Sequence, residues 1–145
     1  MNIIIADKHP IMIEGIKCAL ESIPGYKVVA VTHNGIQLLN ILKRTQPDMI
    51  ISDISLKEMS GIQVCKLLKH QGATLKFVFV TSYIDEEILN LCKNSGAEAL
   101  LSNTMPKENF IEAICSISSH GNTIFSNIIS NNSCHYIKPF KCFIF

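Results

Sequence analysis

Short apolar runs alternate with amphipathic stretches along most of the chain. Each run is four to six residues long and consists mainly of aliphatic residues and phenylalanine, which is typical of strands buried on both faces of a parallel sheet. The five runs are Asn2–Ala6, Lys27–Val31, Met49–Ser52, Leu75–Val80 and Ala97–Leu101. After each run, apolar residues recur every three or four positions, which predicts amphipathic helices.

Local signals mark where these helices begin. Pro10 suits the first turn of a helix, and we interpret the preceding His9 as a structural residue at this helix start. Ser60 and Gln63 have the spacing of a capping box. Strands that alternate with helices through short connections predict a doubly wound α/β domain over residues 1–121, with a five-stranded parallel sheet.

Polar side chains gather where the apolar runs end. Asp7 and Lys8 follow the first run, and Asp53 follows the third. Thr81 and Asn103 occupy the corresponding places after the fourth and fifth runs. Because the carboxyl ends of parallel strands share one edge of the sheet, we expect a functional site at this edge.

Composition and charge exclude several classes of protein. The 145 residues include 13 basic and 12 acidic side chains, a net charge of +1, whereas a nucleic-acid surface needs clustered lysine and arginine. No apolar run approaches the roughly 18 residues that span a bilayer, and the N-terminus lacks the pattern of a signal peptide. The six cysteines are scattered and form no CxxC pair. We therefore expect a cytoplasmic protein with reduced thiols and no membrane partner.

Four ordered blocks of sequence carry a family resemblance. They are ADKHPIMIEGI at 6–16, PDMIISDISLKEMSGIQV at 47–64, FVFVTSYIDEE at 77–87, and GAEALLSN with PKENFIEAI within 96–114. Together they resemble the receiver domain of bacterial two-component response regulators of the LuxR (NarL) type. The resemblance implies a flavodoxin-like fold with the strand order 2-1-3-4-5.

The resemblance also implies roles for individual residues. Asp53 matches the phosphoacceptor, whose carboxylate takes a phosphoryl group from the histidine of a sensor kinase. Thr81 matches the hydroxyl that contacts this phosphoryl group. Asp7 and Asp53 match carboxylates that hold Mg²⁺, and Ser55 matches the residue whose backbone carbonyl also binds the ion.

Three positions depart from the family pattern. Lys8 replaces the second acidic metal ligand, Asn103 replaces a lysine that binds the phosphoryl group, and Leu100 replaces an aromatic switch residue. Because Lys8 repels a divalent cation, we expect Mg²⁺ binding to be weak or absent, with the ammonium group between Asp7 and Asp53. In the alternative, Lys8 points into solvent and Asp53 is a working phosphoacceptor.

The last 24 residues do not have the pattern of a DNA-binding module. We expect a short linker helix at Asn122–Ser130, followed by an atypical hydrophobic tail over residues 131–145. LuxR-type regulators continue into a helix-turn-helix domain of roughly 60 residues that reads DNA. We therefore expect no direct DNA binding by this chain.

These features together predict a signalling domain rather than an enzyme. We expect an atypical phosphorelay receiver that acts in transcription regulation by pairing, through its helix faces, with itself or a related response regulator. A sensor histidine kinase is the expected upstream partner. The alternatives are a functional phosphoacceptor of a truncated LuxR-type transcription factor, and a remnant of such a factor that forms mixed dimers.

Overall fold

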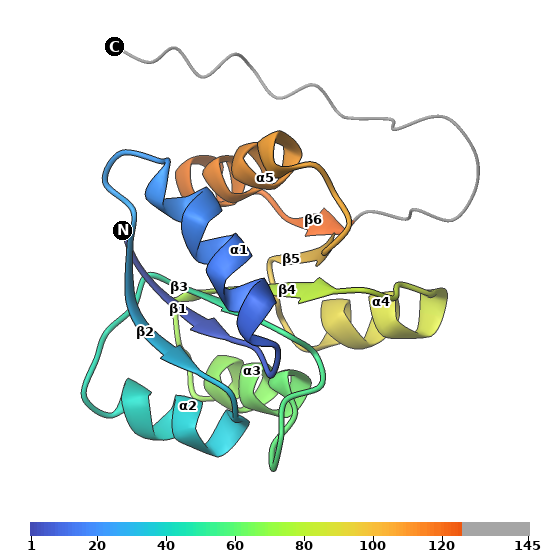
Figure 1. Ribbon diagram of the computed structural model, residues 1–145. Helices are drawn as coiled ribbons and strands as arrows, with labels where there is room; N and C mark the ends of the chain where they lie inside the picture. Colours follow the sequence, from blue (N-terminus) through green and yellow to red (C-terminus); the bar gives the residue numbers. More distant parts are fainter. Residues whose placement is uncertain (126–145) are drawn as a thin grey trace.

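The computed structural model describes residues 1–125 and shows a parallel sheet with helices on both faces (Figure 1). The strands lie in the order β2-β1-β3-β4-β5-β6. They are β1 (Asn2–Ala6), β2 (Lys27–Thr32), β3 (Met49–Ser52), β4 (Lys76–Thr81), β5 (Ala99–Ser102) and β6 (Ile124–Phe125). The helices are α1 (Pro10–Glu21), α2 (Gly35–Leu42), α3 (Gly61–His70), α4 (Glu86–Asn94) and α5 (Lys107–His120). The predicted α/β fold and the order 2-1-3-4-5 are confirmed for the first five strands.

The isoleucines of β1 show why helices cover both faces of the sheet. Ile3 and Ile5 lie in a core shared with α1 and α5, whereas Ile4 lies in the opposite core, shared with α2, α3 and α4. All three side chains are fully buried. Because successive side chains of a strand point to opposite faces, an uninterrupted apolar run is stable only between two layers of helices.

The helix starts follow the predicted local signals. Helix α1 begins at Pro10. At the start of α3, the Ser60 hydroxyl accepts a hydrogen bond from the Gln63 backbone N–H, and the Gln63 side chain accepts one from the Ser60 N–H. The capping box is therefore confirmed. Within residues 1–125, no helix combines the length and the apolar character needed to cross a membrane.

A sixth strand corrects the prediction of five strands. Ile124 and Phe125 pair in parallel with β5, where we expected part of a linker helix. The reason is local: Gly121 adopts a left-handed conformation (φ 64°) that ends α5, and the Ile124 N–H then bonds to the Glu98 carbonyl at 2.8 Å. The remainder of the expected linker helix and the hydrophobic tail lie in 126–145, outside the described residues.

Two buried cysteines are expected to resist alkylation in the folded protein. Burial raises the pKa of the Cys65 thiol, and it raises the pKa of Cys92 to about 12. Because the thiolate is the reactive form, iodoacetamide at about pH 8 should modify exposed Cys18 at least about a hundredfold faster than Cys92. Peptide mass spectrometry measures these rates. Urea should remove the difference, and equal rates in the native protein would contradict the prediction.

Candidate functional site

Backbone hydrogen bonds align the loops that follow the strands. The Asp53 N–H donates to the Ala6 carbonyl at 2.8 Å, which holds the end of β3 beside the end of β1. The Asn103 N–H donates to the Thr81 carbonyl at 2.9 Å, which does the same for β5 and β4. The carboxyl ends of these four strands therefore form one edge, and the polar residues singled out in the sequence lie along it.

Asp7 is held in place by a neighbour that the sequence analysis treated as purely structural. Asp7 is only 4% exposed, and its Oδ1 accepts hydrogen bonds from the His9 backbone N–H (2.7 Å) and from His9 Nδ1 (2.9 Å). On the other side, His33 Nδ1 lies 2.9 Å from the Asp7 carbonyl oxygen. The sequence signal for His9 was its position two residues after a carboxylate at a strand end, where the backbone turns into a helix.

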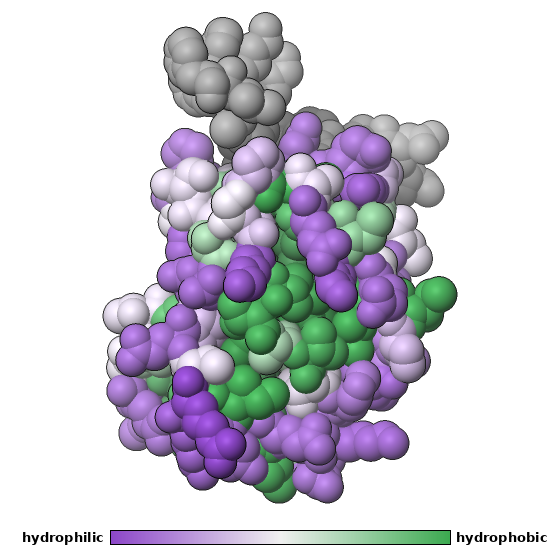
Figure 2. All heavy atoms as spheres, turned by 60° about the vertical axis from the view of Figure 1, so that its left-hand side comes forward, coloured by the Kyte–Doolittle hydropathy of each residue, from purple (hydrophilic) through white to green (hydrophobic). Residues whose placement is uncertain are grey.

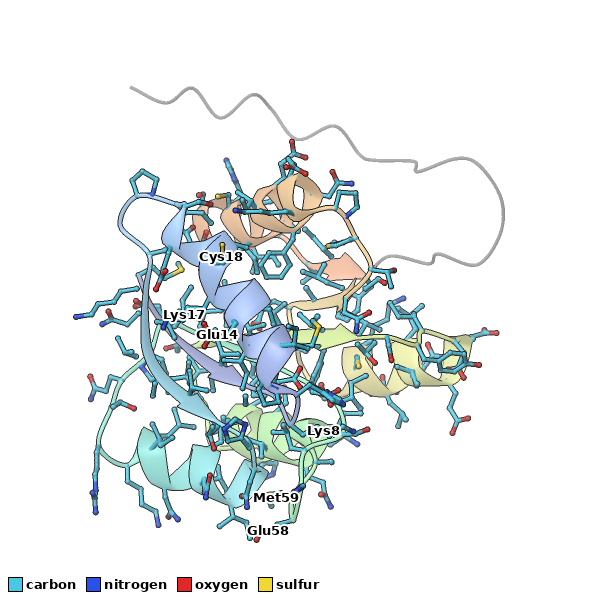
Figure 3. All side chains as sticks on the ribbon, in the orientation of Figure 1. Lys8, Glu14, Lys17, Cys18, Glu58 and Met59 are labelled. Atoms are coloured by element: carbon cyan, nitrogen blue, oxygen red, sulfur yellow. The ribbon has the colours of Figure 1, made fainter. Side chains whose placement is uncertain are left out.

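Lys8 lies beside the carboxylate of Asp53. Its Nζ is 3.7 Å from Asp53 Oδ2, and the Lys8 and Asp53 side chains are 36% and 12% exposed. Figure 3 shows Lys8 on the loop after β1, above the loop between β3 and α3. Among the described residues, Asp53 is the one ion-pair partner of Lys8. The ammonium group is thus paired with the carboxylate of Asp53, while the carboxylate of Asp7 accepts hydrogen bonds from His9.

Hydroxyl groups lie at the ends of β4 and β5, and one of them, that of Ser102, was not expected from the sequence. Thr81 is half-buried at the end of β4, and its partner across the β4–β5 register is Ser102. Ser102 is buried, and its hydroxyl lies 2.7 Å from that of Thr104. Asn103 is half-buried just beyond it and adds no positive charge. The available signal was the position of Ser102 directly after the fifth apolar run.

The other two residues of the expected site are Leu100, on β5, and Ser55, on the loop after β3. Leu100 is fully buried in the core shared with α2, α3 and α4. Ser55 is exposed on the loop between β3 and α3, two residues beyond Asp53. The position of Leu100 fixes an apolar side chain where the family resemblance implies a mobile aromatic residue.

Backbone hydrogen bonds fix the loop between β3 and α3, which begins with Asp53. The Gly61 N–H donates to the Ile54 carbonyl at 2.9 Å, and the Gly35 N–H donates to the Lys57 carbonyl at 3.2 Å. Glu58, labelled in Figure 3, has φ 62°, the only positive φ of a non-glycine residue in the described chain. Such a conformation costs on the order of 1 kcal/mol, so the surrounding contacts must impose it.

The site brings two carboxylates and an imidazole close to one ammonium group. One atom each from Asp7, His9 and Asp53 lie within 4.8 Å of one another. Mg²⁺ prefers oxygen ligands, which Asp7 and Asp53 offer, whereas His9 offers a nitrogen. One Asp7 oxygen already accepts two hydrogen bonds, and Asp53 faces a cation. With one lysine against two carboxylates, the local charge is −1 before any ion binds.

Comparison with known proteins places this geometry in a family. YhcZ of Bacillus subtilis, an uncharacterized transcriptional regulatory protein, is 32% identical over 109 residues, which cover 74% of this chain and 51% of that protein. The nitrate/nitrite response regulator NarP of Escherichia coli is 30% identical over 130 residues, covering 89% and 60%. The chain thus spans between half and about three fifths of the length of these relatives.

A solved structure and a family profile point to the same kind of domain as these relatives. The isolated receiver domain of RcsB from Salmonella enterica serovar Typhimurium, determined with the phosphomimetic BeF₃⁻, has a TM-score of 0.79 at 26% identity. That match covers 88% of this chain and 94% of the solved one. The profile of the response regulator receiver domain matches residues 3–115. Receiver domains are signalling domains that typically bind Mg²⁺ in an acidic pocket. The chain therefore belongs to the response regulator receiver domain family, with relatives of the LuxR type.

Proposed function

We propose that this chain is an atypical receiver that works by protein contact and is phosphorylated poorly or not at all. The observation that carries the proposal is the ion pair between Lys8 Nζ and Asp53 Oδ2 at 3.7 Å. The ammonium group sits beside the carboxylate that would attack a phosphoryl group. It also replaces the carboxylate through which a divalent cation would be held there.

Electrostatics support weak phosphotransfer. At ~4 Å and an effective dielectric of ~20, two unit charges interact by about 4 kcal/mol, although the partial exposure of Lys8 leaves much less than this. Mg²⁺ binding would have to break this contact and overcome repulsion by the ammonium group. A phosphoryl group on Asp53 would add negative charge where Asn103 offers no compensating cation.

The proposed role is therefore that of a contact surface in transcription regulation. The curated relatives are a transcriptional regulatory protein and a response regulator. Buried Leu100 supports a surface that does not switch, because the position offers no aromatic side chain that could swing inward on activation. We place the protein in the cytoplasm, with another response regulator chain as its partner and a sensor histidine kinase as a weak phosphodonor at most. DNA binding, if it occurs in an assembly, would come from the partner chain.

Direct phosphodonor labelling of the wild-type chain tests this proposal. The full chain is titrated with Mg²⁺ up to about 10 mM by NMR, and is then incubated with acetyl phosphate or beryllofluoride. We expect no saturation and no mass increase at Asp53, because Lys8 competes with the metal for the carboxylate. Saturation at millimolar Mg²⁺ together with labelled Asp53 would favour the alternative, a working phosphoacceptor.

A further inference from the structure

Asp7, His9 and Asp53 form a mixed group of oxygen and nitrogen donors at the carboxyl edge of the sheet. One donor atom from each residue lies within 4.8 Å of the other two. Two ligands of one zinc-sized ion lie at most about 4.2 Å apart, because each bond is about 2.1 Å long. Movements of under about 1 Å would therefore bring all three donors around a single ion.

The buried carboxylate of Asp7 has one oxygen left for a ligand. Asp7 is 4% exposed, and its Oδ1 accepts hydrogen bonds from the His9 N–H and from His9 Nδ1. Within residues 1–125, Asp7 Oδ2 has no hydrogen-bond or ion-pair partner. A buried carboxylate oxygen without a partner is unfavourable, so a cation bound beside it would satisfy an atom that the fold leaves unsatisfied.

The His9 ring is placed where a second ligand of the same ion would lie. Its Nδ1 is 2.9 Å from Asp7 Oδ1. Neighbouring ligands of an octahedral ion with bonds of about 2.1 Å are about 3.0 Å apart, so an ion can replace the shared proton with little movement. The His9 side chain is 56% exposed, which leaves it accessible to ions from solvent.

We propose that Asp7, His9 and Asp53 bind a divalent ion of the Co²⁺, Ni²⁺ and Zn²⁺ class, with His9 as the ligand that selects it over Mg²⁺. Imidazole is a good ligand for these ions, whereas Mg²⁺ prefers oxygen. The site thus differs in one ligand and in metal class from the acidic Mg²⁺ pocket typical of receiver domains. The inference does not depend on whether Asp53 is phosphorylated.

Lys8 lowers the affinity of this site for every divalent cation without blocking it. Its Nζ is 3.7 Å from Asp53 Oδ2, and its side chain is 36% exposed. Ion pairs of such exposure contribute little free energy, so the lysine can turn into solvent when an ion binds. Because Co²⁺ and Mg²⁺ carry the same charge, Lys8 repels both alike, whereas the His9 nitrogen favours Co²⁺. Lys8 therefore sets the affinity, and His9 sets the selectivity.

Titration of the full chain with CoCl₂ and, separately, with MgCl₂ tests the proposal by NMR. We expect Co²⁺ to bind at least about tenfold more tightly than Mg²⁺, and Zn²⁺ to displace it. The paramagnetic effects of Co²⁺ should be largest at His9 and in the loops that follow β1 and β3. Effects centred instead on Cys134 and His135, which are alternative ligands in the sequence, would overturn the assignment.

The state of association is followed during the same titration. Figure 2, which brings the β2 side of the molecule forward, shows an apolar area framed by hydrophilic residues, and Val29 and Val31 of β2 are exposed. A cation that bridges two chains would also broaden NMR signals. We expect sedimentation to give the same monomer fraction with and without Co²⁺. Dimers that form only with Co²⁺ would contradict a site within one chain.

His9→Gln and His33→Ala form a matched pair of variants. Glutamine keeps an amide that can donate to Asp7 but offers no imidazole, so His9→Gln should weaken Co²⁺ binding at least about tenfold and change Mg²⁺ binding by less than about twofold. His33 is also exposed, but its Nδ1 lies 2.9 Å from the backbone carbonyl of Asp7, so His33→Ala should leave both affinities unchanged.

Lys8→Ala separates affinity from selectivity. It should tighten Co²⁺ and Mg²⁺ binding by a similar factor, and circular dichroism reports whether each variant is folded. The proposal is overturned if the wild-type chain binds no Co²⁺ or binds it no better than Mg²⁺. Co²⁺ binding that persists at full strength in folded His9→Gln would overturn it as well, since the histidine would then not be a ligand.

Discussion

Lys8→Asp is expected to lower the dissociation constant for Mg²⁺ at least tenfold and to allow labelling of Asp53 by acetyl phosphate. The substitution removes the ammonium group 3.7 Å from Asp53 Oδ2 and adds an oxygen ligand beside it. The local charge changes from −1 to −3, which favours a divalent cation. A tenfold change corresponds to about 1.4 kcal/mol, well within the reach of two unit charges at this distance. Metal titration by NMR and intact-protein mass spectrometry measure the two effects.

Two further variants separate the causes of this effect. Lys8→Ala removes the competing cation without supplying a ligand, so it should give an intermediate Mg²⁺ affinity. Lys66→Asp makes the same change of charge at an exposed position of α3. Lys66 has no ion-pair partner among the described residues, so this variant should behave as the wild type. If Lys8→Asp binds Mg²⁺ no better than Lys66→Asp, the pairing of Lys8 with Asp53 is not what limits the site.

Gly61→Ala is expected to lower the free energy of unfolding by about 3 kcal/mol and the melting temperature by about 10 °C. A Cβ at this position would lie 2.3 Å from the Asp53 carbonyl oxygen and 2.8 Å from the Ser52 hydroxyl. The first of these contacts is with backbone, so the strain can be relieved only by moving the loop that carries Asp53. Thermal unfolding and urea denaturation measure the loss of stability, and NMR shifts of Asp53 report the movement.

Gly15→Ala is the matched control for the effect of an added methyl group. Gly15 lies in α1, and a Cβ built on it meets nothing within 4 Å. Alanine has the higher helix propensity, so this variant should gain roughly 0.5–1 kcal/mol of stability. Wild-type stability of Gly61→Ala would show that the β3–α3 loop yields more easily than its contacts indicate.

Periodicity in the sequence predicted most of the secondary structure. The Asn2–Ala6 and Met49–Ser52 strands have the bounds read from the sequence, because runs of apolar residues between two helical layers have few other stable arrangements. The fourth strand is shifted by one residue, to Lys76–Thr81, and its last residue is the candidate site hydroxyl. The missed strand, β6, is two residues long and depends on pairing with β5, so no local periodicity could indicate it.

The sequence by itself determined that Asp7, Lys8, Asp53, Thr81 and Asn103 follow or end strands at one edge of the sheet, because strand ends and their order follow from local pattern and family resemblance. Only the tertiary structure decided how they pair there: Lys8 with Asp53, His9 with Asp7, and Thr81 beside Ser102 across the strand register. Such pairs join loops that are distant in sequence, or depend on how a side chain turns within its loop. Distances of a few ångströms between charged atoms, which decide whether a cation can bind, are set by packing rather than by spacing along the chain.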